Sequence, residues 1–334
     1  MASGVAPHPL SATWASTAWR AEATQWARSA AAARGIGGVG TVEQSRVRPW
    51  SAQLVLPSDA GRLWFKANGP HMVHEPALVR TLARLFPDRV REPVAVDSDR
   101  GWMLSVDEGP TLEAAGDVDL STWLAIVTEA AALQRQVSGH GEAVVGSGLP
   151  DLRAERLLVV LDVLVETLSA LPERHPTHLD ASSRELIDAA RPWLSDAIDV
   201  LRGSPVPPSL QHGDLHPNNV FARREPGAPY RVFDFGDAQW AHPFELLVVP
   251  TRWLLHSHGV SAVDAVRAAY LQVFTDVASR AELEQLVAIT ARTHAIGRSL
   301  TWWGATAAMT AEESRDYGPA ARAALMQLTD SRPS

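Results

Sequence analysis

The period of the apolar pattern changes near residue 109, and this change restricts the fold more than any other feature of the sequence. Before that point the chain carries short runs of β-branched and aromatic residues, separated by turn-forming residues, which are typical of antiparallel strands. These runs cover residues 41–47, 51–57, 61–67, 94–99 and 101–106. A helical pattern begins at Glu75, between the third and fourth runs. We therefore predict a small antiparallel sheet with one main helix.

After residue 109 the apolar residues recur every three or four positions, which predicts long helices. The predicted helices cover residues 119–137, 151–171, 181–202, 243–257, 261–278, 280–303 and 310–328. A chain of 334 residues exceeds the usual length of a single core, so we expect two lobes of an α+β protein. Residues 1–106 would form the N-terminal lobe, with a helical extension at 12–34. Residues 107–334 would form the larger, mainly helical C-terminal lobe.

Composition excludes several classes of protein. The net charge of −8 and the absence of a basic run argue against a nucleic-acid partner. The chain has no Cys, which rules out disulfides, thiolate nucleophiles and Cys-ligated zinc, and agrees with a cytoplasmic location. We expect neither a signal peptide nor a membrane span, because the most apolar stretch, residues 157–168, is interrupted by acids. The oligomeric state leaves no trace in the sequence.

A short irregular patch between the helices carries three side-chain oxygen donors that could converge. It reads LQHGDLHPNNVFARREPGAPYRVFDFGDAQW, residues 210–240, and contains Asp214, Asn219 and Asp234. Two short strands joined by a hairpin would bring both ends of this patch together. Carboxylate and amide oxygens suit Mg²⁺. The patch therefore predicts a magnesium site.

Lys66 is the single lysine among thirty Lys and Arg residues. A lysine is a compact point charge on a thin stem, whereas arginine is a planar fork, so a site can require one and reject the other. Taken alone, one lysine could also be an accident of composition.

The irregular patch resembles the protein-kinase-like fold, and in particular the aminoglycoside phosphotransferase and choline kinase family. The resemblance rests on a spaced set of residues: His212, Gly213, Asp214, Asn219, Asp234, Phe235 and Gly236. It implies transfer of a phosphoryl group from ATP or GTP with the help of Mg²⁺. Asp234 and Asn219 would hold the metal, and Asp214 would accept the proton of a hydroxyl group. Lys66 would neutralise the nucleotide phosphates, and Glu75 would pair with it.

The nucleotide loop departs from the family pattern. No Gly-x-Gly-x-x-Gly lies between the first two strands, and the Gly-rich run at 35–40 precedes the first strand. Backbone amides near Trp50 and Ser51 are the expected cover for the phosphates. The adenine of the nucleotide is expected against the hinge between the lobes, roughly Ser105 to Gly109 and including Asp107, through backbone groups.

The segment after Asp234 is too short to hold a peptide substrate, which favours a small hydroxyl compound. The candidate acceptor residues are Asp237, Glu245, Arg298 and Trp302. The two acids suit an amino sugar or aminoglycoside and the tryptophan suits a sugar ring or a cation, but the arginine suits an anion. The tryptophan could equally belong to the core, so the acceptor stays open.

Two other readings compete with a small-molecule kinase. A nucleotide-binding regulatory module without turnover is disfavoured by the retained Asp214, Asn219, Asp234 and Lys66. A metal-dependent hydrolase is suggested by the His-x-Asp-x-His pattern that ends at His216, but no further ligand cluster supports it. His212 is expected to be a buried imidazole bonded to the backbone near Asp234.

Overall fold

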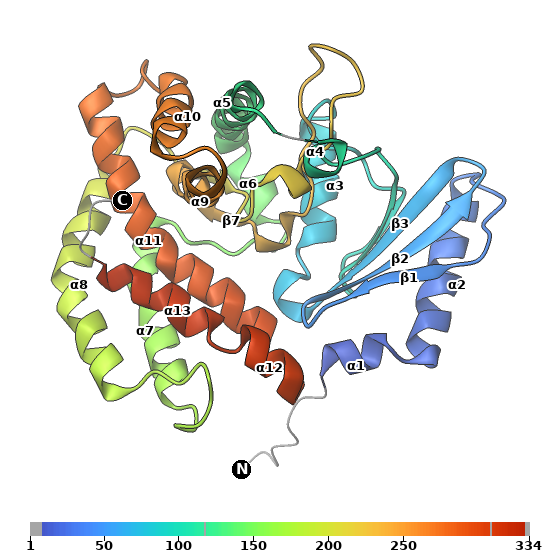
Figure 1. Ribbon diagram of the computed structural model, residues 1–334, viewed down its shortest axis with the longest axis horizontal. Helices are drawn as coiled ribbons and strands as arrows, with labels where there is room; N and C mark the ends of the chain where they lie inside the picture. The colour runs from blue at the N-terminus through green and yellow to red at the C-terminus, as the bar shows by residue number, and fades with distance from the viewer. Residues whose placement is uncertain (1–8, 117, 308, 331–334) are drawn as a thin grey trace.

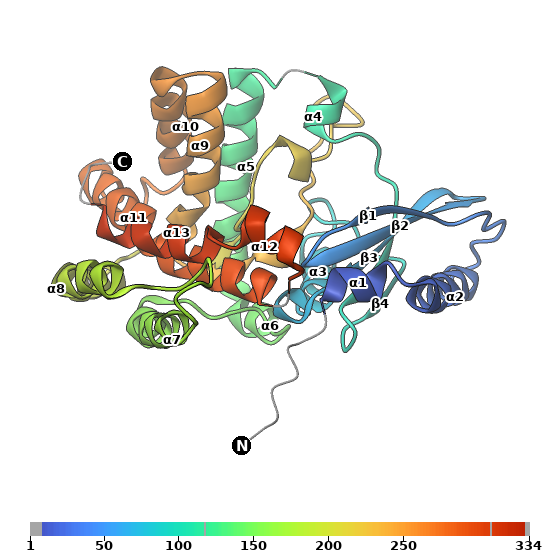
Figure 2. The ribbon, with the colours of Figure 1, turned by 60° about the horizontal axis from the view of Figure 1, so that its bottom comes forward.

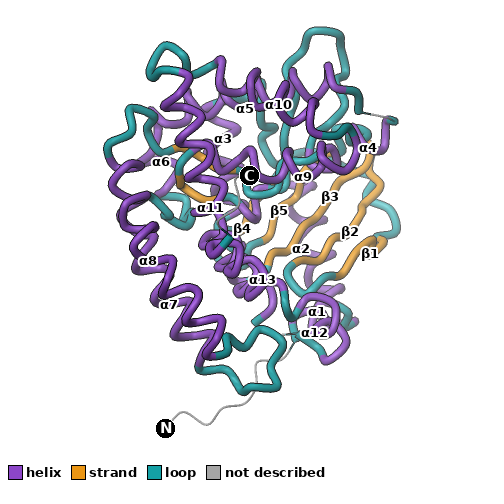
Figure 3. Tube along the Cα trace, turned by 60° about the vertical axis from the view of Figure 1, so that its left-hand side comes forward, coloured by secondary structure: helices purple, strands orange, loops and turns teal. Residues whose placement is uncertain are grey.

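The structure is a computed structural model that describes residues 9–116, 118–307 and 309–330, and it has two lobes (Figure 1). The N-terminal lobe holds a five-stranded antiparallel sheet, in the order β1, β2, β3, β5, β4. Its strands are β1 (Glu43–Val47), β2 (Ser51–Ser58), β3 (Gly61–Asn68), β4 (Ala95–Asp97) and β5 (Trp102–Val106). Figure 3 shows these strands gathered on one side of a largely helical molecule. All five predicted strands are therefore confirmed.

One face of this sheet is covered by two N-terminal helices, α1 (Leu10–Trp14) and α2 (Thr17–Ala33) (Figure 2). We expected one helix over residues 12–34, but the chain breaks at Ser16, whose side chain accepts a hydrogen bond from the amide of Trp19 and starts α2. Alternate strand residues form the core beneath α2: Ala52, Leu54, Leu56, Leu63, Phe65, Ala67, Trp102 and Leu104. The opposite face of the sheet is left for the site.

The helix α3 (Glu75–Leu85) joins the two lobes, as its position in Figure 1 shows. Pro76 fits its first turn, where a missing N–H costs no helical hydrogen bond. Leu78 and Leu82 are fully buried in a cluster with residues of the C-terminal lobe such as Phe235 and Trp240. This packing fixes Glu75, at the start of the helix, between the lobes.

The C-terminal lobe is a helical assembly around one large core. Its helices are α4 (Leu112–Ala115), α5 (Leu120–Val137), α6 (Gly141–Val145), α7 (Leu157–Ser169), α8 (Ala181–Arg202), α9 (Val248–Ser257), α10 (Val260–Gln272), α11 (Arg280–Thr306), α12 (Ala311–Tyr317) and α13 (Ala320–Met326). The predicted bounds of α8 are confirmed. The helix predicted at 310–328 is instead two helices, because Pro319 cannot continue α12 and begins α13. None of the helices in the described ranges is long and apolar enough to cross a bilayer.

Two strands that the sequence analysis missed bring the ends of the irregular patch together. They are β6 (Ser209–Gln211) and β7 (Gln239–Ala241), which pair antiparallel with Leu210 opposite Trp240. The prediction of two short strands joined by a hairpin between residues 220 and 233 is wrong. The structure pairs these two segments only through a single antiparallel bridge, between Val220 and Val232. The two ends of the irregular patch are therefore joined by the pairing of β6 with β7.

Candidate active site

The loop from His212 to Asn219 follows β6 and touches the loop that contains Asp234. Gly213 has φ +83°, and a Cβ atom at this position would lie 2.2 Å from the carbonyl oxygen of Asp237. Any side chain would therefore push the two loops apart. This close approach is the physical reason for a glycine directly after His212.

His212 is the imidazole that fixes this loop, as expected from the sequence. Its Nε2 lies 3.0 Å from the carbonyl oxygen of Phe233, and its Nδ1 accepts a hydrogen bond from the amide of Asp214 at 3.3 Å. Burial lowers the pKa of His212, which agrees with a neutral ring that carries its proton on Nε2. The ring thus joins the backbone of both motif loops and takes no direct part in chemistry.

Asp214 projects from the loop beside two polar neighbours. His216 Nε2 lies 3.2 Å from its Oδ2, and Asn219 Nδ2 donates to its carbonyl oxygen at 2.8 Å. Burial favours the protonated acid, but the hydrogen bond from His216 and the charge of Arg298 outweigh burial and lower the pKa of Asp214. The carboxylate is therefore ionised at neutral pH and available as a proton acceptor.

Asp234 is held in an unusual backbone conformation at the other loop. Its φ is +64°, the one positive value for a non-glycine residue in the described part of the chain. Such a conformation is strained and persists only where surrounding contacts enforce it. The contacts come from Lys66, whose Nζ lies 2.7 Å from Oδ1 of Asp234.

Lys66 bridges the two lobes through two carboxylates. Its Nζ also lies 2.6 Å from Oε2 of Glu75, and Oε1 of Glu75 accepts the amide of Phe235 at 3.0 Å. Glu75 is completely buried. The predicted pairing of Lys66 with Glu75 is present, and it extends to Asp234.

The charges of this cluster support one another. Burial alone would lower the pKa of Lys66, but the carboxylates of Asp234 and Glu75 outweigh it and raise that pKa well above its usual range. For Asp234, burial opposes ionisation while the ammonium of Lys66 favours it, and the net result is a lowered pKa. Lys66 and Asp234 are therefore both charged at neutral pH.

The donors near Asp234 fit a magnesium ion. Asn219 uses its Nδ2 for the hydrogen bond to Asp214, so its Oδ1 is left without a protein donor among the described residues. The backbone carbonyl of Asn219 accepts the amide of Phe233 at 3.1 Å, which places Asn219 beside the segment that leads into Asp234. Two oxygen ligands suffice for Mg²⁺, which keeps several waters and binds phosphates. The described residues contain no cluster of three or more His, Asp or Glu placed to hold a metal.

The expected nucleotide residues lie along the open face of the sheet. Ser51 starts β2 opposite Asn68, and Ser105 lies on β5 opposite Trp64, two residues before Lys66 on β3. The carboxylate of Asp107 accepts hydrogen bonds from Arg62 Nε at 2.6 Å and from the amide of Gly109 at 2.9 Å. These two hydrogen bonds hold the hinge, and they use both oxygens of the Asp107 carboxylate.

The turn between β1 and β2 reaches across to the C-terminal lobe. The carbonyl oxygen of Trp50 accepts the amide of Gly69 at 2.7 Å. Its ring packs edge-on against Trp302 of α11 and Tyr317 of α12, with centroids 5.8 and 5.1 Å apart. This contact closes one end of the site, and it occupies a face of Trp302.

The candidate acceptor residues do not form a single group. Arg298 Nη1 lies 2.8 Å from Oδ2 of Asp237, and both side chains are 16% exposed. Glu245 is buried at 3% exposure, where Thr293 donates to its Oε1 at 3.3 Å, so the structure does not bring it to the others. Trp302 lies beside Arg298, with the guanidinium 5.1 Å from its ring centroid.

Trp253, which the sequence did not single out, stacks on the histidine that contacts Asp214. Trp253 of α9 stacks on the ring of His216, with centroids 5.1 Å apart and an interplanar angle of 16°. Trp253 is only partly buried. Its helical position gave no signal, because the contact depends on how α9 packs against the 212–219 loop.

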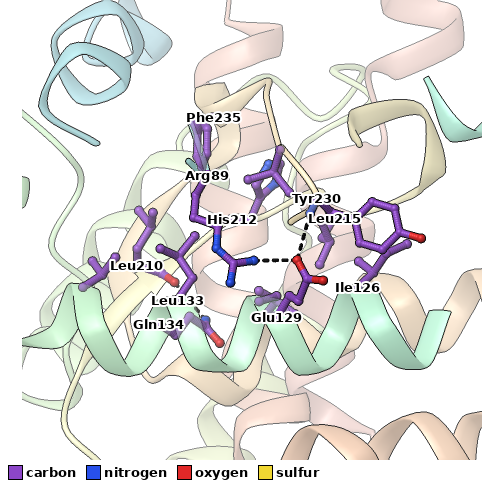
Figure 4. Close-up of a pocket in the computed structure, with 14 residues that line it drawn as sticks. Arg89, Ile126, Glu129, Leu133, Gln134, Leu210, His212, Leu215, Tyr230 and Phe235 are labelled. Atoms are coloured by element: carbon purple, nitrogen blue, oxygen red, sulfur yellow. Dashed lines mark hydrogen bonds and ion pairs between the residues drawn. The ribbon is translucent and has the colours of Figure 1, made fainter. Parts of the chain in front are cut away.

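A small, mainly apolar cavity lies behind the 212–219 loop, against α5 (Figure 4). His212 and Phe235 line it, while Asp214 does not. At its rim Glu129 accepts hydrogen bonds from Arg89 at 2.5 Å and from the amide of Tyr230 at 2.8 Å. The bond from Tyr230 ties the hairpin to α5, and the bond from Arg89 ties the segment after α3 to it. The cavity therefore lies beneath the loop, and the Asp214 carboxylate does not point into it.

Comparison with known proteins indicates the class of protein to which this site belongs. The model of the phosphotransferase enzyme family matches residues 124–283, which include the 212–219 loop and Asp234. This match confirms the resemblance seen in the sequence, and with it the prediction of a phosphotransferase. No curated protein matches the chain in sequence.

Solved structures share the fold over almost the whole chain. A macrolide 2'-phosphotransferase from Brachybacterium faecium is 17% identical, with a TM-score of 0.56 over 92% of this chain and 99% of that chain. A choline/ethanolamine kinase family protein from Mesorhizobium loti is also 17% identical, with a TM-score of 0.58 over 93% and 96%. An ethanolamine kinase from Plasmodium vivax is 12% identical, with a TM-score of 0.59 over 85% and 81%. The predicted two-lobed, kinase-like fold is confirmed.

Proposed function

We propose that this protein transfers the γ-phosphoryl group of ATP or GTP, with Mg²⁺, to a hydroxyl group of a small molecule. The observation that carries the proposal is the bridge from Lys66 to Glu75 and Asp234, with Asp214 and Asn219 on the adjoining loop. These residues come from both lobes, so the nucleotide phosphates would bind between them.

Each side chain has a role that its environment supports. Lys66, kept charged by its two carboxylate partners, would bind phosphate oxygens. Asp234 and Oδ1 of Asn219 would hold Mg²⁺, which neutralises phosphate charge when bound. Asp214 would orient the acceptor hydroxyl and take its proton as the oxygen forms its bond to the γ-phosphorus and the bond to the β-phosphate oxygen breaks. The nucleoside diphosphate would then leave.

The paired charges of Asp237 and Arg298 select the acceptor neither as a cation nor as an anion. Asp237 and Arg298 pair with each other, so neither the carboxylate nor the guanidinium is free to select an ion of opposite charge. This pairing removes the conflict between the two residues that the sequence presented. We propose an acceptor whose hydroxyl lies near Asp214, with Trp253 and His216 beside it. Amino sugars and aminoglycosides remain candidates, and so do macrolides, choline and ethanolamine, which the similar structures name.

A screen that couples release of the nucleoside diphosphate to a colour change tests the proposal. The wild-type protein is incubated with ATP or GTP, Mg²⁺ and each acceptor, and Asp214→Asn serves as the control. We expect acceptor-dependent release by the wild type alone. Binding of nucleotide without release for any acceptor would favour a regulatory module, and release that does not depend on an acceptor would favour a hydrolase.

A further inference from the structure

Arg46 on β1 shares a face of the sheet with Lys66. The strand register places Arg46 opposite Gln53 on β2, and Gln53 opposite Lys66 on β3. Residues directly opposite each other in an antiparallel sheet direct their side chains to the same face. Arg46, Gln53 and Lys66 therefore form a row across three strands, on the face that looks toward Asp234.

A bulge in β1 gives Arg46 this orientation. Gln44 pairs with Leu54, but Arg46 pairs with Gln53, so Ser45 is an extra residue in the strand. Without the extra residue Arg46 would lie opposite Ala52, which is buried beneath α2. With the bulge, the apolar Val47 takes the place opposite Ala52 and packs against that core. The bulge thus keeps a guanidinium out of the core and on the open face.

The guanidinium of Arg46 has no protein partner in the described residues. Arg46 is exposed, and no hydrogen bond or ion pair of its side chain is found there. Many other arginines near the site are already paired, as Arg298 is with Asp237 and Arg62 with Asp107.

The turn after β1 supplies few amides for phosphates. The amide of Arg48 is bonded to the carbonyl oxygen of Ser51 at 2.8 Å, and Pro49 has no N–H. Of the three turn residues, Trp50 alone retains a donor for a ligand. A glycine-rich loop would offer several backbone donors at this place, so the chain needs another source of positive charge.

We propose that Arg46 is a second cationic ligand for the phosphates of the nucleotide, opposite Lys66. This inference rests on the proposed function. The planar fork of a guanidinium can bind two phosphate oxygens at once, which a single ammonium cannot do in that geometry. Lys66 lies between the carboxylates of Glu75 and Asp234, which leave no room for a guanidinium. Arg46 lies on β1, the strand at the edge of the sheet.

Calorimetric titration of Arg46→Ala and Arg46→Lys with nucleotide tests the inference. ATP and GTP are each compared with their nucleosides, in the presence of Mg²⁺. Arg46→Ala should bind the triphosphate about ten- to a hundredfold more weakly, the range expected for one charge-assisted contact. Its affinity for the nucleoside should not change, and Arg46→Lys should recover part of the loss. Arg20→Ala, an exposed arginine on α2 behind the sheet, is the matched control.

The outcomes separate the two proposals. A wild-type protein that binds neither ATP nor GTP overturns the proposed function and this inference together. A wild-type protein that binds a triphosphate, with Arg46→Ala binding it within twofold as well, overturns the inference alone. Equal losses for triphosphate and nucleoside also overturn it, because they would show that the substitution distorts the sheet. A loss confined to the triphosphate supports the inference.

Discussion

The proposed nucleotide side and the proposed acceptor side of the site are built in different ways. On the nucleotide side, the ammonium of Lys66 lies within 2.7 Å of two carboxylates, that of Glu75, nine residues along the chain, and that of Asp234, 168 residues along it. On the acceptor side, Asp237 and Arg298 neutralise each other, and Glu245 lies buried among helices. On the first side one ammonium is shared by two carboxylates, whereas on the second side one guanidinium pairs with one carboxylate.

This difference follows from the chemistry of each side. A phosphate chain and its magnesium ion require particular charged groups, which leaves few alternatives for each position. An acceptor can be selected by shape and by apolar contact, which many combinations of side chains can provide. Substitutions should therefore have large effects on the nucleotide side and at the transfer point, and smaller effects on the acceptor side.

The largest effect is expected for Asp214→Asn. The amide keeps the size of the side chain but cannot accept the proton of the hydroxyl group, so kcat should fall by about 10²- to 10⁴-fold. Nucleotide affinity, measured by calorimetry, should stay within about threefold of the wild type, since the proposed phosphate ligands are intact. Loss of nucleotide binding in this variant would exclude Asp214 as the base.

A smaller but still large effect is expected for Lys66→Arg. The side chain of Lys66 is 11% exposed and fits between two carboxylates at 2.6 and 2.7 Å, where a longer planar fork would displace Asp234. We expect kcat/KM for the nucleotide to fall by about a hundredfold, equal to about 2.7 kcal/mol. Arg20→Lys on α2 should be unaffected. Full activity of Lys66→Arg would show that the single lysine has no special role.

The acceptor side can be tested by breaking its internal pair. Arg298→Met leaves the carboxylate of Asp237 uncompensated in a mostly buried place, so the free energy of unfolding in urea should fall by about 3 kcal/mol. The KM for the acceptor should rise by about tenfold while the KM for the nucleotide changes little. Adding Asp237→Asn should restore most of the stability. If the double variant is instead as unstable as the sum of the single ones, the two residues are not coupled.

The smallest effect is expected at a buried histidine away from the transfer point. Burial lowers the pKa of His242 to about 3, while its Nδ1 accepts the amide of Phe244. The unfolded chain binds the proton near pH 6.5, so between pH 6.5 and 3 it takes up more protons than the folded chain. The free energy of unfolding should therefore fall as the pH is lowered, by about 2 kcal/mol from pH 7.5 to 5 through this residue.

His242→Asn keeps an acceptor for Phe244 but does not titrate. Its free energy of unfolding, measured by urea denaturation at pH 7.5 and at pH 5, should fall less than that of the wild type between the two values. Equal slopes in both proteins would show that His242 is already protonated or exposed in the folded state. Activity at pH 7.5 should be close to that of the wild type.

Much of the fold was predictable because its signals are local. The five strands of the N-terminal lobe and the helix α8 follow from apolar periodicity over short windows. The strands β6 and β7 were missed because each has only three residues, too few for a periodic pattern, and because they gain stability only by pairing across the patch. The break before α13 had a local signal, Pro319, that the sequence analysis did not use.

The candidate site divides in the same way. Asp214, Asn219, Asp234 and Lys66 could be chosen from the sequence because phosphoryl transfer requires those residue types at those spacings. Trp253 and Arg46 could not, because one depends on the packing of α9 and the other on a bulge that changes the register of β1. Glu245 was placed with the acceptor residues because an acid suits an amino group, whereas helix packing buries it against Thr293.

By itself, the sequence determined which chemical groups the protein has for phosphoryl transfer, since a carboxylate, an amide and an ammonium at fixed spacings are properties of residue type. The tertiary structure decided which charges remain available. It paired Asp237 with Arg298, and it turned Arg46 away from the core. The physical reason is that ionic interactions depend on distance and on exclusion of water, and both are set by the packing of elements that are far apart in the chain.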